Sequence, residues 1–522
     1  MNAVPSPRLT SRRDFLRRTS IISATLSTVA ATASRVPAAA AAAPGDEIIT
    51  MSATKLAALI RAKKISATEA VEAYMKRQVA VNQKLNAVVT NCYERALAEA
   101  KVLDEKAAKG EFVGALHGVP MTIKDSLDTE GVVSTGATMG RQTFVPKKDA
   151  TVVARARKHG AILLGKTNTP EFTLGGLSGI STASNLLFGA SHNPYDLTRS
   201  TSGSSGGAGA IVAACGAAFD IGSDWGGSIR GPAHNNGIAG IKPTSVRIPR
   251  TGHIVDFGGV FDLWQQLGPM TRRVEDLTLI TPLLSGPDFK DCACAPMPWS
   301  DPAAVDFKKL RVAFCSDNGA TLPVALTSDD TKQIVVQVAK WLEGSVALVQ
   351  EDHPKDILNE LAAARTKLTG GDAWAFYKRL ADKHGTKNFS PSVKERMSRM
   401  TPITSAEYVE AWEKADETKS QMLGWMKNYD VFICPVAGKP AQPIDVDPSL
   451  PSAWGTPGSG WPYTGAFNST GWPSVVVRCG SSSEGRLPIG LQIVGAPWRE
   501  DVCLAVASFL EAKSGGWQRP PV

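Results

Sequence analysis

The sequence lacks any long apolar run of the kind that crosses a membrane. Its 522 residues are 43% hydrophobic and 20% charged, which is typical of a soluble globular protein. After the N-terminal region, no stretch reaches the roughly 18 apolar residues that a membrane-spanning helix needs. Internal repeats are also missing. We therefore expect no membrane span, and we expect one large α/β domain with insertions to account for the length.

A strong excess of one charge is missing once the N-terminus is set aside. The formal net charge is +8, but residues 1–44 contain six arginines against one aspartate, which accounts for five of those eight charges. The remaining +3 is dispersed along the chain. A basic surface for nucleic acid or for an anionic membrane is therefore not expected.

Those first 44 residues are typical of an export signal. Ser11–Arg18 reads SRRDFLRR, a twin-arginine string, and a weakly apolar run, Ile21–Ala33, and an alanine tract ending near Ala43 follow it. Charged, apolar and small-residue regions come in this order in signal peptides. An Arg-rich transit peptide or a disordered basic tail is the alternative. We expect the twin-arginine export machinery to deliver the protein to a periplasmic or secreted location, with residues 45–522 as the mature domain.

Cysteine spacing typical of a metal site is absent. The eight cysteines are scattered, Cys292 and Cys294 are too close for a C-x-x-C pair, and no pair of histidines accompanies them. Buried free thiols are the simplest interpretation. The sequence thus predicts no metal ligands, and whether any cysteines pair stays open.

Strands and helices alternate in the N-terminal half. A short apolar strand, Val119–Ile123, ends at Lys124, and after a helix a second strand, Ala161–Leu164, is followed closely by Lys166. This order predicts a large mixed, mostly parallel central sheet with helices on both faces. Residues just past the strand ends of such sheets are favoured places for catalytic groups. Residues 355–428 are predicted to form a polar helical insertion over the sheet.

Residues 200–244 hold eleven glycines and six serines in two clusters. The first cluster, Gly203–Gly207, formally matches the G-x-S-x-G nucleophile elbow. That elbow needs a strand before it, and the preceding residues are polar turn sequence. A phosphate-binding loop would need a closing lysine and hydroxyl that are missing here. Neither interpretation is favoured.

The second cluster favours acyl transfer. Gly226 and Gly227 stand directly before Ser228, so several backbone N–H groups lie beside one hydroxyl. Acyl transfer needs such donors where negative charge develops, and a serine can act as the nucleophile when a base is near. A tight glycine-rich turn that packs a helix is the alternative if the cluster is taken by itself.

The base is not evident among the seven histidines. His117 and His234 flank the interesting segments, and we interpret both as hydrogen-bonded structural residues. A lysine can serve as the base if burial lowers its pKa enough to make the neutral amine available. Lys124, at the end of an apolar strand, is a candidate for such burial.

Taken together, these motifs resemble the signature of the amidase signature family of serine hydrolases. The resemblance rests on G-S-S-G-G, G-S-D-x-G-G-S-I-R-x-P-A and G-x-K-P-T in the stretch Gly203–Thr244. It extends to GVPMTIKD around Lys124, GKTNTPEF at Gly165, NPYD at Asn193, GPMTR at Gly268, FNSTGWPS at Phe467 and LPIGLQIVGAPW at Leu487. The similarity covers about residues 52–512.

The resemblance implies a Ser–cis-Ser–Lys catalytic set. Ser228 matches the family's nucleophile, Ser204 the relay serine whose peptide bond is cis, and Lys124 the base. The family's oxyanion donors would be the backbone N–H groups of Trp225, Gly226, Gly227 and Ser228, and its supporting residues Asp224, Arg230 and Ser205. No metal or organic cofactor is implied.

The substrate is less determined than the chemistry. Trp225 stands where smaller or aliphatic residues are common in the family, and Ser202 replaces a frequent glycine. Aromatic residues in candidate loops favour an apolar or aryl amide, although they could equally be core; they are Trp225, Phe257, Phe261, Trp264, Trp454, Trp461 and Trp472. Carbamates, aryl ureas and esters are alternative substrates, and a non-catalytic binding protein with this fold is a further alternative. An amidotransferase component fits poorly with an export signal, and a homodimer is left open.

Overall fold

A computed structural model describes residues 48–177, 182–255, 259, 263–399, 402–444 and 458–522. The expected export signal, residues 1–44, lies outside the described residues. So do Phe257, Phe261 and Trp454, which the sequence placed in candidate substrate loops.

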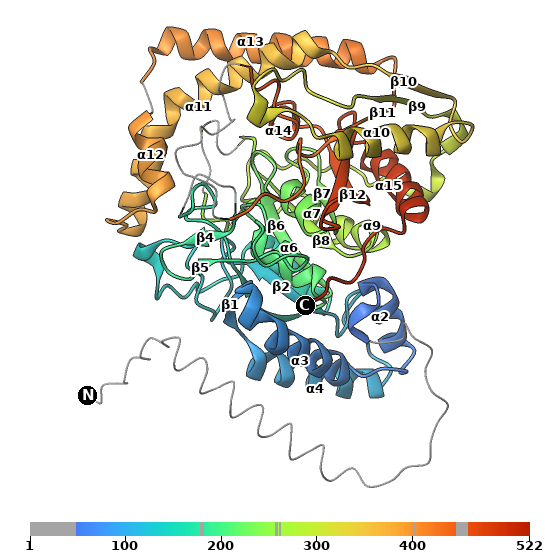
Figure 1. The fold of residues 1–522 in the computed structure, drawn as a ribbon. Coiled ribbons are helices and arrows are strands. Elements are labelled where there is room, and N and C mark those ends of the chain that lie inside the picture. The colour runs from blue at the N-terminus through green and yellow to red at the C-terminus, as the bar shows by residue number, and fades with distance from the viewer. Residues whose placement is uncertain (1–47, 178–181, 256–258, 260–262, 400–401, 445–457) are drawn as a thin grey trace.

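An eleven-stranded sheet runs through the molecule in the order β1-β3-β2-β6-β8-β7-β12-β13-β11-β9-β10 (Figure 1). Its strands are β1 Val88–Asn91, β2 Pro120–Lys124, β3 Ile162–Thr167, β6 Phe219–Asp224, β7 Ala239–Lys242, β8 Gln266–Thr271, β9 Arg311–Phe314, β10 Leu348–Glu351, β11 Val431–Pro435, β12 Ser474–Ser481 and β13 Pro488–Gly495. A separate pair is formed by β4 Ser184–Asn185 and β5 Gly189–Ala190.

The expected α/β architecture with a large mixed sheet is confirmed. Parallel pairing is gathered in two groups, β3–β2–β6 and β11–β9–β10. Each group contains a strand–helix–strand crossover, through α5 (Thr151–Lys158) and α10 (Asp329–Leu342), as parallel neighbours require. The strands between the groups pair antiparallel, a feature that the order of the motifs did not predict.

Helices cover both faces of this sheet because its strands are apolar on both sides. In β12, Val475 and Val477 pack with residues of α9, α10 and α15, whereas Val476 packs with residues of α6 and α7. Successive strand residues point to opposite faces, so each face has its own core. The remaining helices are α2 Ala53–Arg61, α3 Ala67–Leu85, α4 Tyr93–Ala108, α6 Gly206–Ala213, α7 Arg230–Asn235, α9 Val274–Leu284, α11 Lys355–His384, α12 Pro391–Arg399, α13 Ser405–Met426, α14 Gly465–Ser469 and α15 Glu500–Ser514.

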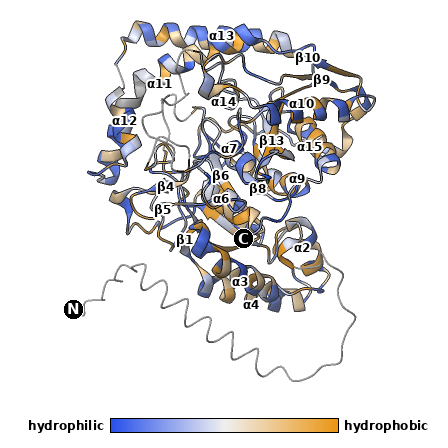
Figure 2. Ribbon diagram, in the orientation of Figure 1, coloured by the Kyte–Doolittle hydropathy of each residue, from blue (hydrophilic) through white to orange (hydrophobic). Residues whose placement is uncertain are grey.

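Helices α11, α12 and α13 occupy the stretch that the sequence predicts to be a helical insertion. They lie together along one side of the molecule, beyond the sheet (Figure 1). Hydrophilic and hydrophobic residues alternate along α13 (Figure 2), and its buried residues recur every three or four positions, as in a helix with one packed face. Apolar residues of these helices share a cluster with Phe172 and Trp264, which docks them onto the rest of the chain.

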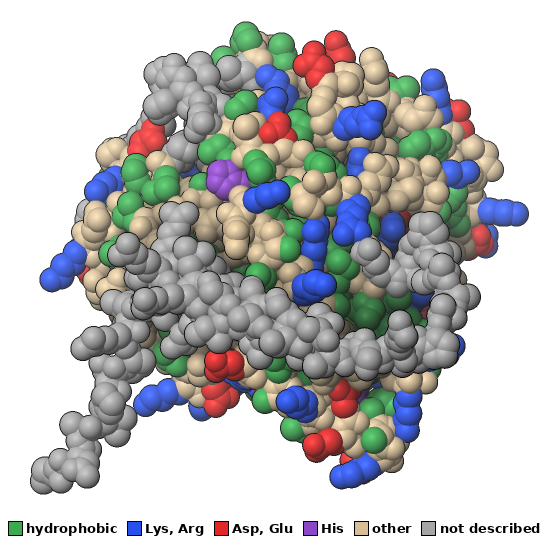
Figure 3. Space-filling view, turned by 60° about the horizontal axis from the view of Figure 1, so that its bottom comes forward, with side chains coloured by type: hydrophobic (Ala, Val, Ile, Leu, Met, Phe, Trp, Pro, Cys, Tyr) green, Lys and Arg blue, Asp and Glu red, His purple; other side chains and the backbone are tan. Residues whose placement is uncertain are grey.

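The surface and the cysteines follow the expected pattern. Lys and Arg side chains are spread over the face drawn in Figure 3, with Asp and Glu interspersed. Within the described ranges, no helix combines the length and apolarity needed to cross a membrane. All eight cysteines are free thiols, and six of them are buried.

Two valines of α10 provide a test of this packing. Val338 is 1% exposed against the sheet, whereas Val336 on the same helix is 42% exposed. Val338→Ala should lower the free energy of unfolding by about 1–3 kcal/mol, because it removes buried methyl groups and leaves a cavity. Val336→Ala, the matched control, should change it by less than about 0.5 kcal/mol. Urea unfolding followed by circular dichroism measures both, and equal effects would contradict the assigned face of α10.

Candidate active site

Lys124 lies at the end of a strand that is buried along its whole length. β2 pairs in parallel with β3 on one side and β6 on the other, and the Lys124 side chain is 0% exposed. Its Nζ lies 2.5 Å from Ser204 Oγ, 2.9 Å from Ser223 Oγ and 3.0 Å from Ser205 Oγ. These contacts are neutral hydroxyls, and no carboxylate of the described residues lies within ion-pair distance of this ammonium group.

Burial lowers the pKa of Lys124 to about 7, because removal from water disfavours the charged amine. The charges of Asp224 and Asp220 oppose this shift. Burial also raises the pKa of Asp220 to about 7, although hydroxyls of Thr122 and Thr167 donate to its carboxylate. Neutral Lys124 is therefore abundant near pH 7 and above, and it is the form that can accept a proton.

Ser204 and Ser205 are brought to Lys124 by the turn that precedes α6. The Gly203–Ser204 peptide bond is cis, as the resemblance implies. Ser205 N donates to the Ser228 carbonyl at 3.1 Å, which ties the two glycine clusters together. A Cβ on Gly222 of β6 would lie 2.7 Å from Ser205 Oγ, so only glycine at this position leaves room for Ser205.

Ser228 lies in the loop that connects β6 to α7. It is half-buried, and a strand does precede it, unlike the first cluster. Its Oγ makes no hydrogen bond to Ser204 or to any other residue in the described part of the chain. The Lys124–Ser204 half of the expected relay is thus in contact, whereas the Ser204–Ser228 half is not. Catalytic hydrogen bonds commonly tighten only when substrate is bound.

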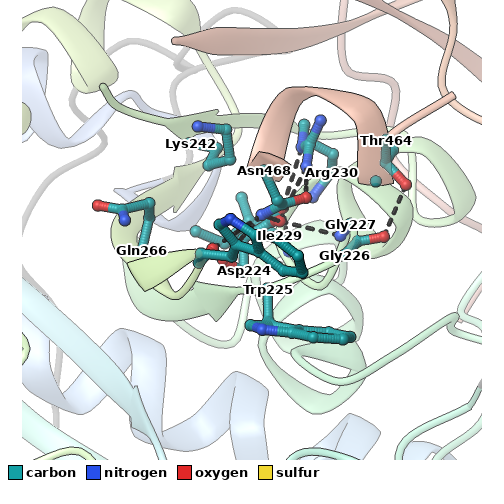
Figure 4. A network of polar contacts seen from close by, with 12 residues as sticks. Asp224, Trp225, Gly226, Gly227, Ile229, Arg230, Lys242, Gln266, Thr464 and Asn468 are labelled. Carbon is teal, nitrogen blue, oxygen red and sulfur yellow. Dashed lines mark hydrogen bonds and ion pairs between the residues drawn. The ribbon is translucent and has the colours of Figure 1, made fainter. Parts of the chain in front are cut away.

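A buried ion pair holds this loop (Figure 4). Arg230 Nη2 and Nε donate to the two carboxylate oxygens of Asp224 at 2.9 and 3.0 Å. Burial alone would raise the pKa of Asp224, but the charge and hydrogen bonds of Arg230 and a hydrogen bond from Asn468 outweigh it and hold the pKa well below its usual range. Asp224 also accepts from Ile229 N at 3.1 Å. The supporting positions expected at Asp224 and Arg230 therefore act on the shape of the loop.

The four expected oxyanion donors are not equivalent in the structure. Gly227 N donates to Asp224 Oδ1 at 2.9 Å, so this amide already has an acceptor inside the loop. The Gly226 and Ser228 amides donate to no acceptor among the described residues. Gly227 has φ +124, and a Cβ there would lie 2.5 Å from Thr464 Oγ1, so this position requires glycine for its conformation and its packing.

Both candidate histidines are structural, as the sequence predicts. The ring nitrogens of His117 contact Val113 N and Leu103 O. Those of His234 contact the backbone of Gly490 and the carbonyl of Lys439. Among the described residues, no three His, Cys, Asp or Glu side chains are grouped to hold a metal ion.

Lys166, the second lysine expected at a strand end, does not join the serine cluster. It is 0% exposed, its Nζ lies 3.9 Å from Asp125 Oδ1, and it donates to Thr129 Oγ1 at 2.9 Å. Lys124 and Lys166 lie on neighbouring strands in adjacent registers, Lys124 opposite Thr167 and Ile123 opposite Lys166. Because the two lysines are one register apart, their side chains leave the sheet on opposite faces.

Several residues around the site carried no assignment from the sequence. Asn468, within the FNSTGWPS motif, donates from Nδ2 to the Asp224 carbonyl at 3.1 Å and to Asp224 Oδ1 at 2.9 Å. Thr464 Oγ1 donates to the Gly226 carbonyl at 2.7 Å, and Arg365 Nη2 donates to the Trp225 carbonyl at 2.9 Å. Asn468 could have been found from its motif, but no local pattern marked Thr464 or Arg365, which reach the loop across more than a hundred residues.

The aromatic candidates separate into two groups. Trp225 and Trp264 lie beside the loop with ring centroids 6.1 Å apart, and Trp264 and Trp412 are 6.0 Å apart. Trp461 and Trp472 are instead buried in a core cluster beneath α13 and α14. An aromatic wall therefore adjoins the Ser228 loop, built from fewer residues than the sequence suggested.

This geometry agrees with comparison to known proteins. A family model described as Amidase matches residues 69–504. The chain belongs to the amidase signature family. It is an amidase-family hydrolase.

Relatives of this amidase-family chain differ in what they are named for. It is 32% identical over 489 residues to a glutamyl-tRNA(Gln) amidotransferase subunit of Alkaliphilus metalliredigens, covering 88% of this chain and 95% of that protein. It is 33% identical over 484 residues to indoleacetamide hydrolase of Bradyrhizobium diazoefficiens, covering 89% of this chain and 86% of that protein. A solved structure of 6-aminohexanoate cyclic dimer hydrolase complexed with substrate superimposes with a TM-score of 0.79 at 27% identity, covering 91% and 99% of the two chains.

Proposed function

We propose that this protein hydrolyses the C–N bond of an apolar or aryl carboxylic amide through an acyl-enzyme on Ser228. The observation that carries the proposal is the placement of Lys124, a buried amine with a lowered pKa whose Nζ contacts are the hydroxyls of Ser204, Ser205 and Ser223. A cationic lysine in this position would be costly. A neutral one is a base within reach of the relay serine.

The proposed reaction has two halves. Neutral Lys124 takes the Ser204 proton while Ser204 takes the Ser228 proton, and Ser228 Oγ attacks the amide carbonyl carbon. The Gly226 and Ser228 amides donate to the resulting oxyanion. The C–N bond then breaks, the relay returns the proton to the leaving nitrogen, and ammonia or an amine departs. Water, deprotonated by the same relay, cleaves the acyl ester, releasing the acid and free Ser228.

An aryl or apolar acyl group is favoured by the aromatic wall. Trp225 is adjacent in sequence to the proposed donor Gly226, and its ring lies against Trp264. Flat aromatic surfaces pack well against aromatic ligands. The relatives named for an indole-substituted amide and for a cyclic amide dimer are consistent with this class of substrate.

Three related proposals stand beside it. Carbamates, aryl ureas and esters present the same carbonyl to the same nucleophile, so they are alternative substrates. The relatives named for a tRNA-dependent amidotransferase support a second role, release of ammonia from an amide for transfer to another acceptor. We also propose that residues 1–44 are a twin-arginine export signal, which places the hydrolase in the periplasm or outside the cell and favours hydrolysis over such a transfer.

Covalent labelling tests the nucleophile. A fluorophosphonate should label the purified protein, and Ser228→Ala should lose the label together with amide hydrolysis, with kcat falling by more than about 10⁴-fold. Ser482→Ala, which changes a serine of the β12–β13 turn, is the control and should keep both. A folded wild-type protein that neither labels nor hydrolyses amides would favour a binding protein.

The pH dependence tests the base. Because Lys124 must be neutral and its pKa is lowered to about 7, kcat/KM should rise about tenfold per pH unit below that value and level off above it. Lys124→Met should abolish turnover. Lys242 is a second buried lysine whose pKa burial lowers to about 7, so Lys242→Met is the matched control and should leave the midpoint in place. Activity that falls as the pH rises through 7 would contradict the assignment.

A substrate panel tests the aromatic wall. Comparison of kcat/KM across aryl and short aliphatic primary amides, anilides, carbamates, ureas and esters should show about a 10- to 100-fold preference for the aryl amides, as expected from burial of one ring. Trp225→Leu should reduce this preference, whereas Trp341→Leu, in the other core cluster, should not. A Trp225→Leu enzyme with unchanged selectivity would place the acyl group elsewhere.

A further inference from the structure

The loop that bears Ser228 has every carbonyl from residue 224 to residue 228 held by a donor. In a planar trans peptide the C=O and the following N–H point in opposite directions, so a donor on one carbonyl sets the direction of the next amide. The pairs are Asp224 O with Asn468 Nδ2 at 3.1 Å, Trp225 O with Arg365 Nη2 at 2.9 Å, Gly226 O with Thr464 Oγ1 at 2.7 Å, Gly227 O with Gly231 N at 2.6 Å, and Ser228 O with Ser205 N at 3.1 Å.

These pairs separate two kinds of amide. Thr464 holds the Gly226 carbonyl, and the amide behind it, Gly227 N–H, is directed to Asp224 Oδ1 inside the protein. Arg365 holds the Trp225 carbonyl, and the amide behind it, Gly226 N–H, has no acceptor among the described residues. The contact from Arg365 therefore orients an amide that is available to a ligand.

Arg365 is also an uncompensated buried charge. It lies on α11, is 7% exposed, and its guanidinium carbon lies 4.2 Å from the Trp225 ring centroid and 4.5 Å from that of Trp264. Its other hydrogen bonds are to Ser469 Oγ and the Gly465 carbonyl, both neutral. No carboxylate within the described ranges forms an ion pair with it. A buried cation without a counter-ion is costly unless a negative charge develops near it.

We propose that Arg365 is a positioning residue for the oxyanion: it orients the Gly226 N–H through the Trp225 carbonyl, and its charge favours the negative oxygen that develops beside that amide. This inference rests on the proposed hydrolase function. It makes helix α11, outside the sheet that carries the serines and Lys124, part of the machinery that stabilises the transition state.

Arg365→Gln and Arg365→Lys separate the two contributions. Gln removes the charge and Lys retains it, while both lose the planar fork that holds the carbonyl and stacks on the rings. We expect kcat to fall about 10²-fold in Arg365→Gln and about tenfold in Arg365→Lys, with KM changing less than about threefold, because only transition-state binding is lost. Affinity for a trifluoromethyl ketone, whose adduct carries the oxyanion, should fall by the same factors, and affinity for the carboxylic acid product should not.

Two controls sharpen the test. Lys367→Gln removes a positive charge from the surface of the same helix, where its side chain is 40% exposed, and it should leave kcat unchanged. Thr464→Val frees the neighbouring carbonyl, whose amide faces Asp224, and it should lower kcat less than Arg365→Gln does. A larger loss in Thr464→Val would overturn the choice of Gly226 as the oriented donor.

The outcomes distinguish this proposal from the function on which it rests. All rates are normalised to the fraction of protein labelled at the endpoint by the fluorophosphonate, so that misfolded molecules do not count. If the wild type hydrolyses amides and Arg365→Gln changes only KM, or lowers ketone and product affinity equally, the positioning role is overturned and the hydrolase stands. If the wild type neither labels nor hydrolyses any amide, both proposals fall.

Discussion

The constraint on which the site depends is the burial of a lysine among hydroxyl groups. Lys124 ends β2 between two parallel neighbours, where water is excluded and an ammonium ion is disfavoured. The same burial raises the pKa of Asp220 to about 7, so the nearest acid below the lysine does not simply restore its charge. The parallel group β3–β2–β6 thus supplies both the position of the amine and its lowered pKa.

A second constraint is the shape of the loop after β6, which five separate parts of the chain determine. The Asp224–Arg230 ion pair closes the loop from within, and breaking such a buried pair by removing one partner is strongly destabilising. Asn468, Thr464 and Arg365 then hold three successive carbonyls from outside. Because the amide directions follow from these carbonyls, the donors for an oxyanion are set by residues that themselves touch no substrate.

The elements that the sequence predicted best are those with a local signal. The strand ending at Lys124, the strand at Ile162–Thr167, helix α10 and the helical stretch after residue 355 all follow from hydrophobic periodicity and from turn residues at their ends. The antiparallel strands in the middle of the sheet were not predicted, because pairing direction depends on which distant strands meet. Trp461 and Trp472 were grouped with the aromatic wall for the same reason, since sequence alone cannot separate a loop tryptophan from a core one.

By itself the sequence determined the family, the α/β architecture and the identity of the residues proposed as nucleophile, relay and base, since these lie in motifs whose order and spacing are visible in one dimension. Only the tertiary structure decided that Lys124 rather than Lys166 meets the serines, because side chains one register apart leave a sheet on opposite faces. Only it showed that Gly227 turns its amide to Asp224 while Gly226 does not. These outcomes depend on contacts such as that of Arg365, whose partner in the loop is 140 residues away.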